Sequence, residues 1–218
     1  WGEMQIAKKI QTVLLPKNPY IKGYEIAAYM APADEVGGDY YDIINVANHD
    51  WVVIGDVSGH GVPAGLIMMM VQTCIQIVLY QHPEVNPSGL LAIVNKTIAN
   101  NIEKLEENKY MTITVMACFK EGKFIHAGLH QDILIYRAST NEVETIETDG
   151  MWLGIVNEVS DMMKDATLNL ENDDIMLLYT DGITEAWEKG NPATERIDHM
   201  FGVEKLKKII HENHSKTT

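Results

Sequence analysis

The sequence is poor in basic residues. It has 17 Lys and Arg residues against 31 Asp and Glu residues, which gives a formal net charge of −14. A nucleic-acid-binding protein needs Lys and Arg to neutralise phosphates, so this balance argues against a nucleic-acid partner. It argues equally against docking on an anionic membrane surface. An acidic composition is compatible with cation-binding sites. Whether such a site exists depends on where the carboxylates stand in the sequence.

Cysteine is scarce as well. The chain has two cysteines, Cys74 and Cys118. They form no CxxC pair, and no histidine stands near either of them at metal-ligand spacing. We therefore expect both thiols to be reduced residues of the core rather than parts of a redox or metal-binding motif.

Long apolar runs and targeting signals are also absent. No run of about eighteen apolar residues occurs, so we expect no membrane span and no membrane contact. There is no signal-peptide pattern, and a cytoplasmic location follows by default. The 218 residues, 46% of them hydrophobic, fit one domain with a substantial core. Because the chain starts at Trp1 without a Met, we expect it to be a piece of a longer protein.

Hydrophobic periodicity predicts an α+β protein. An amphipathic helix is expected over residues 4–15, with an apolar face made of Ile6, Ile10, Val13 and Leu14. Further helices are expected over 62–80, 86–105 and 203–214. Strands are expected over 24–31, 41–46, 51–56, 111–120, 121–128, 132–138, 142–147, 165–170 and 174–181, with 111–147 as a meander. Strands, two helices and more strands, without regular alternation, argue against a doubly wound parallel sheet.

Acidic residues stand beside glycines at the ends of the predicted strands. Asp39 follows two glycines in EVGGDYYD (35–42), Asp56 ends the strand 51–56, and Asp181 precedes a glycine after another apolar run. Glycine lets backbone approach a ligand closely. If these strand ends converge, the carboxylates must share protons or hold a cation. A set of oxygen ligands favours Mg²⁺ or Mn²⁺.

Alternation separates two of these acids. Asp39 and Asp42 are an odd number of residues apart, so on a strand they point to opposite faces. Only one of them can face the site without a bulge. One of the two is therefore expected to serve the site and the other to be structural.

The segment GHGVPAG (59–65) suggests a different ligand. It follows a strand, opens a helix and reads G-x-G-x-x-x-G, one residue longer than the dinucleotide-binding fingerprint. Asp56 precedes it and would repel a phosphate. No GK[ST] phosphate loop occurs, and GDVSG lacks the G-x-S-x-G spacing of a nucleophile elbow. Ser58 and His60, two residues apart, give no evidence of a catalytic triad.

Taken together, these segments resemble the metal-dependent protein phosphatase (PPM) family, in its bacterial SpoIIE/RsbU-like branch. The resemblance covers nearly the whole chain, and its combination of GDVSGHG with VGGDYYD and TDGITEA is specific. The matching pieces, in chain order, are IQTVLLP, EVGGDYYD, GDVSGHGVPAG, YMTITVMACF, AGLHQDILIYR, LGI, LLYTDGITEA and FGVEKL.

The resemblance implies a fold and a metal centre. The fold is a sandwich of two antiparallel β-sheets flanked by α-helices, with a connector helix over residues 1–16 and a phosphatase domain over 17–218. Two Mn²⁺ or Mg²⁺ ions are expected at one end of the sandwich. By position, Asp56 bridges both ions, Asp39 and the carbonyl of Val57 bind one, and Asp181 binds the other. The three aspartates are then the catalytic residues, and Asp42, which faces away from Asp39, is expected to act mainly on stability.

The resemblance also implies an activity and partners. The reaction is hydrolysis of phosphoserine or phosphothreonine on a protein by metal-activated water, which needs no side-chain nucleophile. The implied substrate is a regulatory protein such as a phosphorylated anti-anti-sigma factor, in a partner-switching pathway of bacterial signalling. We expect an upstream sensor domain in the full chain and a homodimer through the N-terminal helix.

Two departures from the family pattern leave alternatives open. The common AGHxPP is AGLHQD here (127–132), so the role of His130 stays open. The Asp-Asp-x-Thr strand, which supplies a further metal carboxylate in this branch, is missing after Phe201, and we expect a C-terminally truncated domain. The alternative is a degenerate or regulatory domain that binds partner proteins without turnover. A third candidate, from GHGVPAG, is a dinucleotide-binding oxidoreductase.

Overall fold

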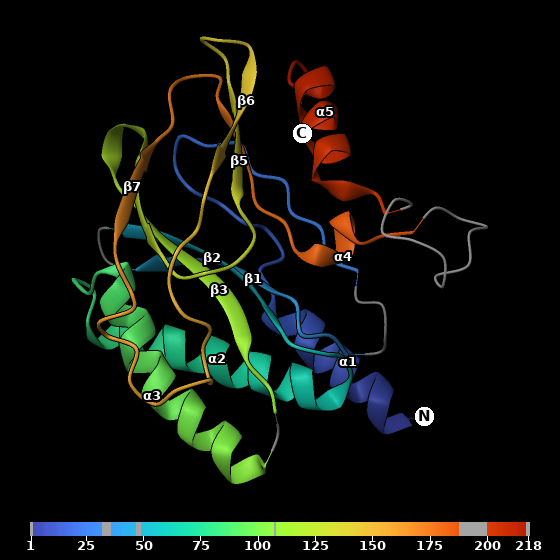
Figure 1. The fold of residues 1–218 in the computed structure, drawn as a ribbon, viewed down its shortest axis with the longest axis vertical. Helices are drawn as coiled ribbons and strands as arrows, with labels where there is room; N and C mark the ends of the chain where they lie inside the picture. Colours follow the sequence, from blue (N-terminus) through green and yellow to red (C-terminus); the bar gives the residue numbers. More distant parts are fainter. Residues whose placement is uncertain (1, 32–35, 47–48, 107, 188–199, 217–218) are drawn as a thin grey trace. The chain divides into compact units, whose positions relative to one another are not determined.

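The structure of the chain is a computed structural model that describes residues 2–31, 36–46, 49–106, 108–187 and 200–216. The chain forms two compact units (Figure 1). The first unit comprises the residues up to His130 together with Thr148–Asn169, and the second comprises Gln131–Glu147 with the residues from Leu170 on.

The first unit is built on a five-stranded antiparallel sheet in the order β1-β2-β3-β4-β7. The strands are β1 (Tyr40–Val46), β2 (His49–Val57), β3 (Met111–Cys118), β4 (Lys123–Ala127) and β7 (Ala166–Asn169). The helices are α1 (Gly2–Leu14), α2 (Val62–Gln81) and α3 (Pro87–Leu105), and a short 3₁₀ turn, η1, spans Lys120–Gly122. Helices α2 and α3 lie side by side on one face of this sheet, α2 against β1 and β2, α3 against β3 and β4 (Figure 1).

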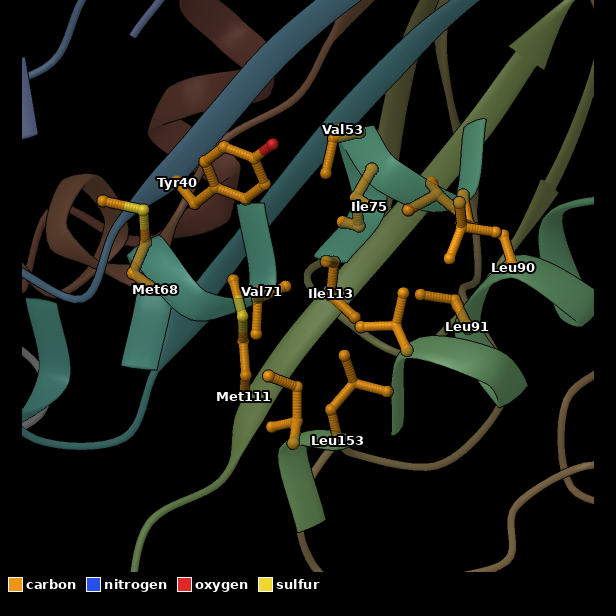
Figure 2. Packing of buried hydrophobic residues seen from close by; sticks show 14 of the residues in the cluster. Tyr40, Val53, Met68, Val71, Ile75, Leu90, Leu91, Met111, Ile113 and Leu153 are labelled. Atoms are coloured by element: carbon orange, nitrogen blue, oxygen red, sulfur yellow. The ribbon is translucent and has the colours of Figure 1, made fainter. Parts of the chain in front are cut away.

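The core of the first unit lies between this sheet and the two helices. Alternate residues of β2, including Trp51 and Val53, point toward the helices and are fully buried. Figure 2 shows Val71 and Ile75 of α2 beside Ile113 of β3 in this layer. Full burial of such a side chain contributes about 1.5–3 kcal/mol. The helix-covered face therefore carries this core, and the opposite face of the sheet holds further buried residues, among them Met116 and Phe124.

Helix α2 is apolar along its whole length. By length and composition it could cross a membrane, with a mean hydropathy of 1.9 over its most apolar window, so on these criteria alone the expectation of no such segment fails. In the structure half of that window is buried, and Met68 and Leu79 are completely covered. The packing gives α2 the place of a core helix, in which Met68 fills the core. Cys74 and Cys118 are free thiols, as predicted.

The second unit has a three-stranded antiparallel sheet in the order β6-β5-β8. The strands are β5 (Ile133–Arg137), β6 (Glu142–Ile146) and β8 (Ile175–Leu177), and the helices are α4 (Asp181–Thr184) and α5 (Gly202–Asn213). Helix α5 packs on β5 and β6, where Leu206 joins Leu134 and Tyr179 in a buried cluster.

Two strand predictions are wrong. Residues 24–31 contain no strand, and Tyr29 within them is 90% exposed, because no described strand pairs with this segment. The meander over 111–147 is divided between the two sheets. Strand β4 pairs with β3 along one edge and with β7 along the other. Strand β5 therefore pairs with β6 and β8 instead.

The predicted fold class is confirmed. The described chain has two antiparallel sheets with helices, and every strand pair of both sheets is antiparallel. A dinucleotide-binding fold of the doubly wound kind needs a mostly parallel sheet. The described strand pairs therefore argue against the oxidoreductase alternative.

Candidate metal centre

Two of the predicted metal ligands meet where β1 begins and β2 ends. The antiparallel pairing of these strands starts at Tyr40 opposite Gly55. One step further along the same register, Asp39 stands opposite Asp56. Residues directly opposite each other in an antiparallel pair have Cβ atoms about 4.5–5.5 Å apart and share one face of the sheet. The register thus places the two residues side by side, each of them partly buried.

Gly38 makes this close approach possible. The N–H of Val57 donates a hydrogen bond to the carbonyl of Gly38 at 3.2 Å, so the pairing continues beyond the strand. A Cβ built on Gly38 would lie 2.5 Å from the carbonyl oxygen of Val57 and 2.8 Å from Oδ1 of Asp56. Any larger residue would push the loop away from the end of β2. The prediction that glycine lets the chain crowd carboxylates is confirmed at this position.

The donor set at this end of the sheet fits a hard divalent cation. It consists of the carboxylates of Asp39 and Asp56 and the carbonyl of Val57, all oxygen donors. Two carboxylates side by side favour a cation or a shared proton. Mg²⁺ is typically held by one or two carboxylates and keeps several waters, which matches this set. Among the described residues, no group of three or more His, Cys, Asp or Glu side chains is close enough to hold a metal ion.

The third predicted ligand, Asp181, belongs to the second unit. Strand β8 ends at Leu177, and Asp181 follows after three further residues as the first residue of α4. Its carbonyl accepts hydrogen bonds from the N–H of Glu185 at 2.7 Å and from Oγ1 of Thr184 at 3.3 Å. The strand is therefore shorter than predicted, and Asp181 opens a helical turn. Its convergence with the two other aspartates stays a prediction.

Asp42 lies on the helix-covered face of β1, away from Asp39. It is 5% exposed. Its carboxylate accepts a hydrogen bond from the hydroxyl of Tyr40 at 3.0 Å, and Gln72 and Gln76 of α2 approach it at 3.5 Å. Burial raises the pKa of Asp42 although these hydrogen bonds act in the opposite direction. The prediction that Asp42 faces away from the site is confirmed.

A threonine and a histidine extend the row of polar residues across the sheet. Thr112 of β3 stands opposite Asp56, and its hydroxyl lies 2.8 Å from Nδ1 of His130. The hydroxyl of Thr148 accepts from the N–H of His130 at 3.1 Å and donates to its carbonyl at 2.7 Å. His130 of the AGLHQD segment is thus held beside β3, the strand that pairs with β2 at Asp56. Sequence reasoning missed Thr112 because its cross-strand partner is not visible in the local pattern.

The glycines of GHGVPAG serve the backbone and its packing. Gly59 and Gly61 have φ values of +77° and +80°, in the left-handed region that favours glycine. Gly65, in the first turn of α2, lies against Val36, and a Cβ there would overlap that side chain. The spacing that resembled a dinucleotide fingerprint is therefore explained by the turn into α2 and by the contact with the loop before Asp39.

Relatives of the chain are found among curated proteins. It is 29% identical over 219 residues to the phosphoserine phosphatase RsbU of Bacillus subtilis, with 97% of this chain and 60% of RsbU covered. It is 21% identical to the phosphoserine phosphatase RsbP of the same organism, with 84% of this chain and 45% of RsbP covered. The chain thus spans between 45% and 60% of the length of these relatives.

Solved structures show the same fold. The SiaA-PP2C domain of Pseudomonas aeruginosa superposes with a TM-score of 0.76 at 17% identity, over 99% of this chain and 83% of that one. The PP2C phosphatase domain of SpoIIE from Bacillus subtilis gives a TM-score of 0.56 at 18% identity, over 81% of this chain and 47% of that one. The sequence profile of the family described as Stage II sporulation protein E (SpoIIE) matches residues 47–218. The chain therefore belongs to the SpoIIE family, in the SpoIIE/RsbU-like branch of the metal-dependent protein phosphatases.

Proposed function

We propose that this chain is a metal-dependent protein serine/threonine phosphatase that hydrolyses phosphoserine or phosphothreonine on a regulatory protein. The observation that carries the proposal is the placement of Asp39 opposite Asp56, beside the carbonyl of Val57. Membership of the SpoIIE family and similarity to two phosphoserine phosphatases support the same reaction.

The proposed division of roles follows from the position of each group. Asp39 and the Val57 carbonyl would hold one Mn²⁺ or Mg²⁺ ion, Asp56 would contribute to both ions, and Asp181 would contribute to the second. When bound, two such ions lower the pKa of a water molecule and neutralise the charge of the phosphate. Gly38 keeps the carboxylate of Asp56 close to the loop that carries Asp39, so both ligands are oriented before substrate arrives.

The proposed substrate is a folded phosphoprotein, such as an anti-anti-sigma factor of a partner-switching pathway, with an upstream sensor domain controlling the activity in the full chain. Similarity to RsbU and RsbP supports this assignment. The net charge of −14 makes a strongly acidic phosphopeptide a poor ligand in the absence of metal ions. Recognition is therefore expected to depend on bound cations and on surfaces of the substrate beyond the phosphorylated residue.

A homodimer through α1 is part of the same proposal. The predicted apolar face of this helix is exposed: Ile6 by 60%, Ile10 by 50% and Val13 by 54%. The side of α1 that packs on the first unit is instead formed by Gln11 and Leu15, which follows the helix. A second copy of α1 would bury these exposed side chains. Each Å² of apolar surface removed from water contributes about 25 cal/mol.

Hydrolysis of p-nitrophenyl phosphate tests the proposed reaction. We expect turnover by the wild-type protein with Mn²⁺ and none with EDTA. Asp56→Asn should lower turnover by at least about a hundredfold, since even residues outside the ligand set change metal sites tenfold to a hundredfold. Asp42→Asn is the matched control and should keep its activity. Absence of hydrolysis under all metal conditions would favour the alternative of a partner-binding domain without turnover.

A further inference from the structure

Lys109 lies against the loop that follows the candidate metal ligands. A Cβ built on Gly59 would be 2.5 Å from Nζ of Lys109. Gly59 comes three residues after Asp56, in the loop that leads from β2 into α2. The ammonium group of Lys109 is therefore held at the same end of β2 as the carboxylate of Asp56.

The backbone next to Lys109 is fixed to this loop. The N–H of Ser58 donates to the carbonyl of Tyr110 at 2.8 Å, and the N–H of Tyr110 donates to Oγ of Ser58 at 3.0 Å. The ring of Tyr110 also stacks on Trp152, with 4.5 Å between ring centroids and 14° between ring planes. These contacts determine where the lysine side chain starts, so its position beside Gly59 is built into the fold.

Among the described residues, no carboxylate pairs with Lys109. The side chain is partly buried, and within the part of the chain that the structure describes it makes no ion pair and no hydrogen bond. Other lysines, among them Lys96, Lys207 and Lys208, do pair with glutamates. A partly buried ammonium group without a carboxylate partner among the described residues can take an anion from outside the chain, since an unpaired buried charge is costly.

We infer that Lys109 binds the phosphate group of the phosphoprotein substrate, as a substrate-positioning residue at the end of β2. This inference rests on the proposed function. Lysine binds phosphate as a point charge and needs no second donor in a fixed plane. The chain has two arginines. Arg137 is engaged by Glu144 and Asp174 within the second unit, and Arg196 lies outside the described residues.

The test compares Lys109→Met and Lys109→Arg with the control Lys104→Met, which removes an exposed charge at the end of α3. In the full chain with saturating Mn²⁺, we expect Lys109→Met to raise both KM for p-nitrophenyl phosphate and the inhibition constant of inorganic phosphate by about tenfold to a hundredfold, the loss of one hydrogen bond to a charged group. Lys109→Arg should restore most of this loss. Calorimetry should give the same Mn²⁺ affinity for all variants.

The outcomes separate this inference from the proposed function. Hydrolysis by the wild type with unchanged KM and phosphate inhibition in Lys109→Met would overturn the role of Lys109 and leave the phosphatase intact. A weaker Mn²⁺ affinity in Lys109→Met would also overturn it, because the lysine would then act on the metal site. If the wild type hydrolyses nothing, the proposed function fails. Calorimetric binding of inorganic phosphate to the Mn²⁺-loaded protein then still decides, and equal affinities in wild type and Lys109→Met would overturn the inference.

Discussion

Asp42 is buried where β1 meets α2, and its burial makes the stability of the fold depend on pH. Burial raises its pKa above the ordinary value of 3.8, with hydrogen bonds from Tyr40 and Gln72 opposing the shift. Because the folded state holds the proton of Asp42 more tightly than the unfolded state, the contribution of this group to the free energy of unfolding is fully present below pH 3.8. It is lost as the pH rises through the raised pKa.

Replacement of the Asp42 carboxylate by an amide should remove this pH-dependent loss of stability. We expect the free energy of unfolding of the wild type to fall relative to that of Asp42→Asn as the pH rises from about 4 toward neutrality. Urea unfolding at a series of pH values measures the difference. Asp161→Asn, a change at an exposed carboxylate, is the control. Identical pH profiles for the wild type and Asp42→Asn would show that burial does not perturb this group.

The small size of Gly38 matters at the candidate centre. In Gly38→Ala the new methyl would meet the Val57 carbonyl and the Asp56 carboxylate, so the loop must move. We expect a loss of about 1–3 kcal/mol in the free energy of unfolding, as for other overpacked sites, together with weaker Mn²⁺ binding. Gly2→Ala, where nothing lies within 4 Å of the new Cβ, is the control. Unchanged stability and Mn²⁺ binding in Gly38→Ala would contradict the close approach.

Single residues differ in how far the sequence reveals them. The placement of Asp39 and Asp56 at one end of the β1–β2 pair could be predicted because each stands beside a glycine at the end of a strand, and their motif order matches a family. The neighbouring Thr112 and Lys109 could not be predicted, because each lies at this end of the sheet through its place next to another strand or loop. Cross-strand register is a tertiary property that a local pattern does not contain.

At the scale of elements, α1 is tied to the loop that carries Asp39. Gln11 is 2% exposed. Its side-chain amide donates to the carbonyl of Gly37 at 2.6 Å and accepts from the N–H of Gly37 at 3.1 Å. The carbonyl of Leu14 accepts a further hydrogen bond from Gln72 of α2 at 2.8 Å. The position of α1 and the geometry of the site loop are therefore linked.

Removal of this link should weaken both stability and metal binding. In Gln11→Leu two backbone groups of Gly37 lose their hydrogen-bond partners. Each of these groups that stays buried lowers the free energy of unfolding by about 1–3 kcal/mol. We expect a lower melting temperature and weaker Mn²⁺ binding. Thr12→Ala, an exposed change on the same helix, should alter neither. A Gln11→Leu variant that binds Mn²⁺ as tightly as the wild type would show that α1 does not influence the loop.

The exposed apolar face of α1 makes a prediction about assembly. We expect the wild type to sediment as a dimer and Ile10→Lys to sediment as a monomer, because a charge in the helix pair would be buried without a partner. Lys9→Gln, next to it on an exposed part of the helix, should stay dimeric. A monomeric wild type across the micromolar range would exclude this interface.

Helices and most strands could be predicted because their periodicity is strong. Residues 62–80 and 86–105 became α2 and α3 with small shifts at the ends. The segment 24–31 failed because strand-like composition does not supply a partner strand. The meander failed because the choice of which edge each strand takes is decided by the whole sheet.

For the whole molecule, the order of motifs was more informative than composition. The net charge of −14 argues against a nucleic-acid partner but names no activity. The succession of EVGGDYYD, GDVSGHG and TDGITEA led to the fold class, which the two antiparallel sheets and the PP2C-type relatives confirm. The sequence could not show how each strand is paired, since this depends on contacts between distant segments.

The central claim is that Asp39 and Asp56 together hold a divalent cation. Titration calorimetry with Mn²⁺ on the wild type, Asp39→Asn, Asp56→Asn and Asp42→Asn tests it most directly. The account predicts that the wild type and Asp42→Asn bind Mn²⁺ and that both other variants lose this binding, Asp56→Asn most severely. Binding to Asp56→Asn with wild-type affinity, or its loss in Asp42→Asn alone, would contradict the account.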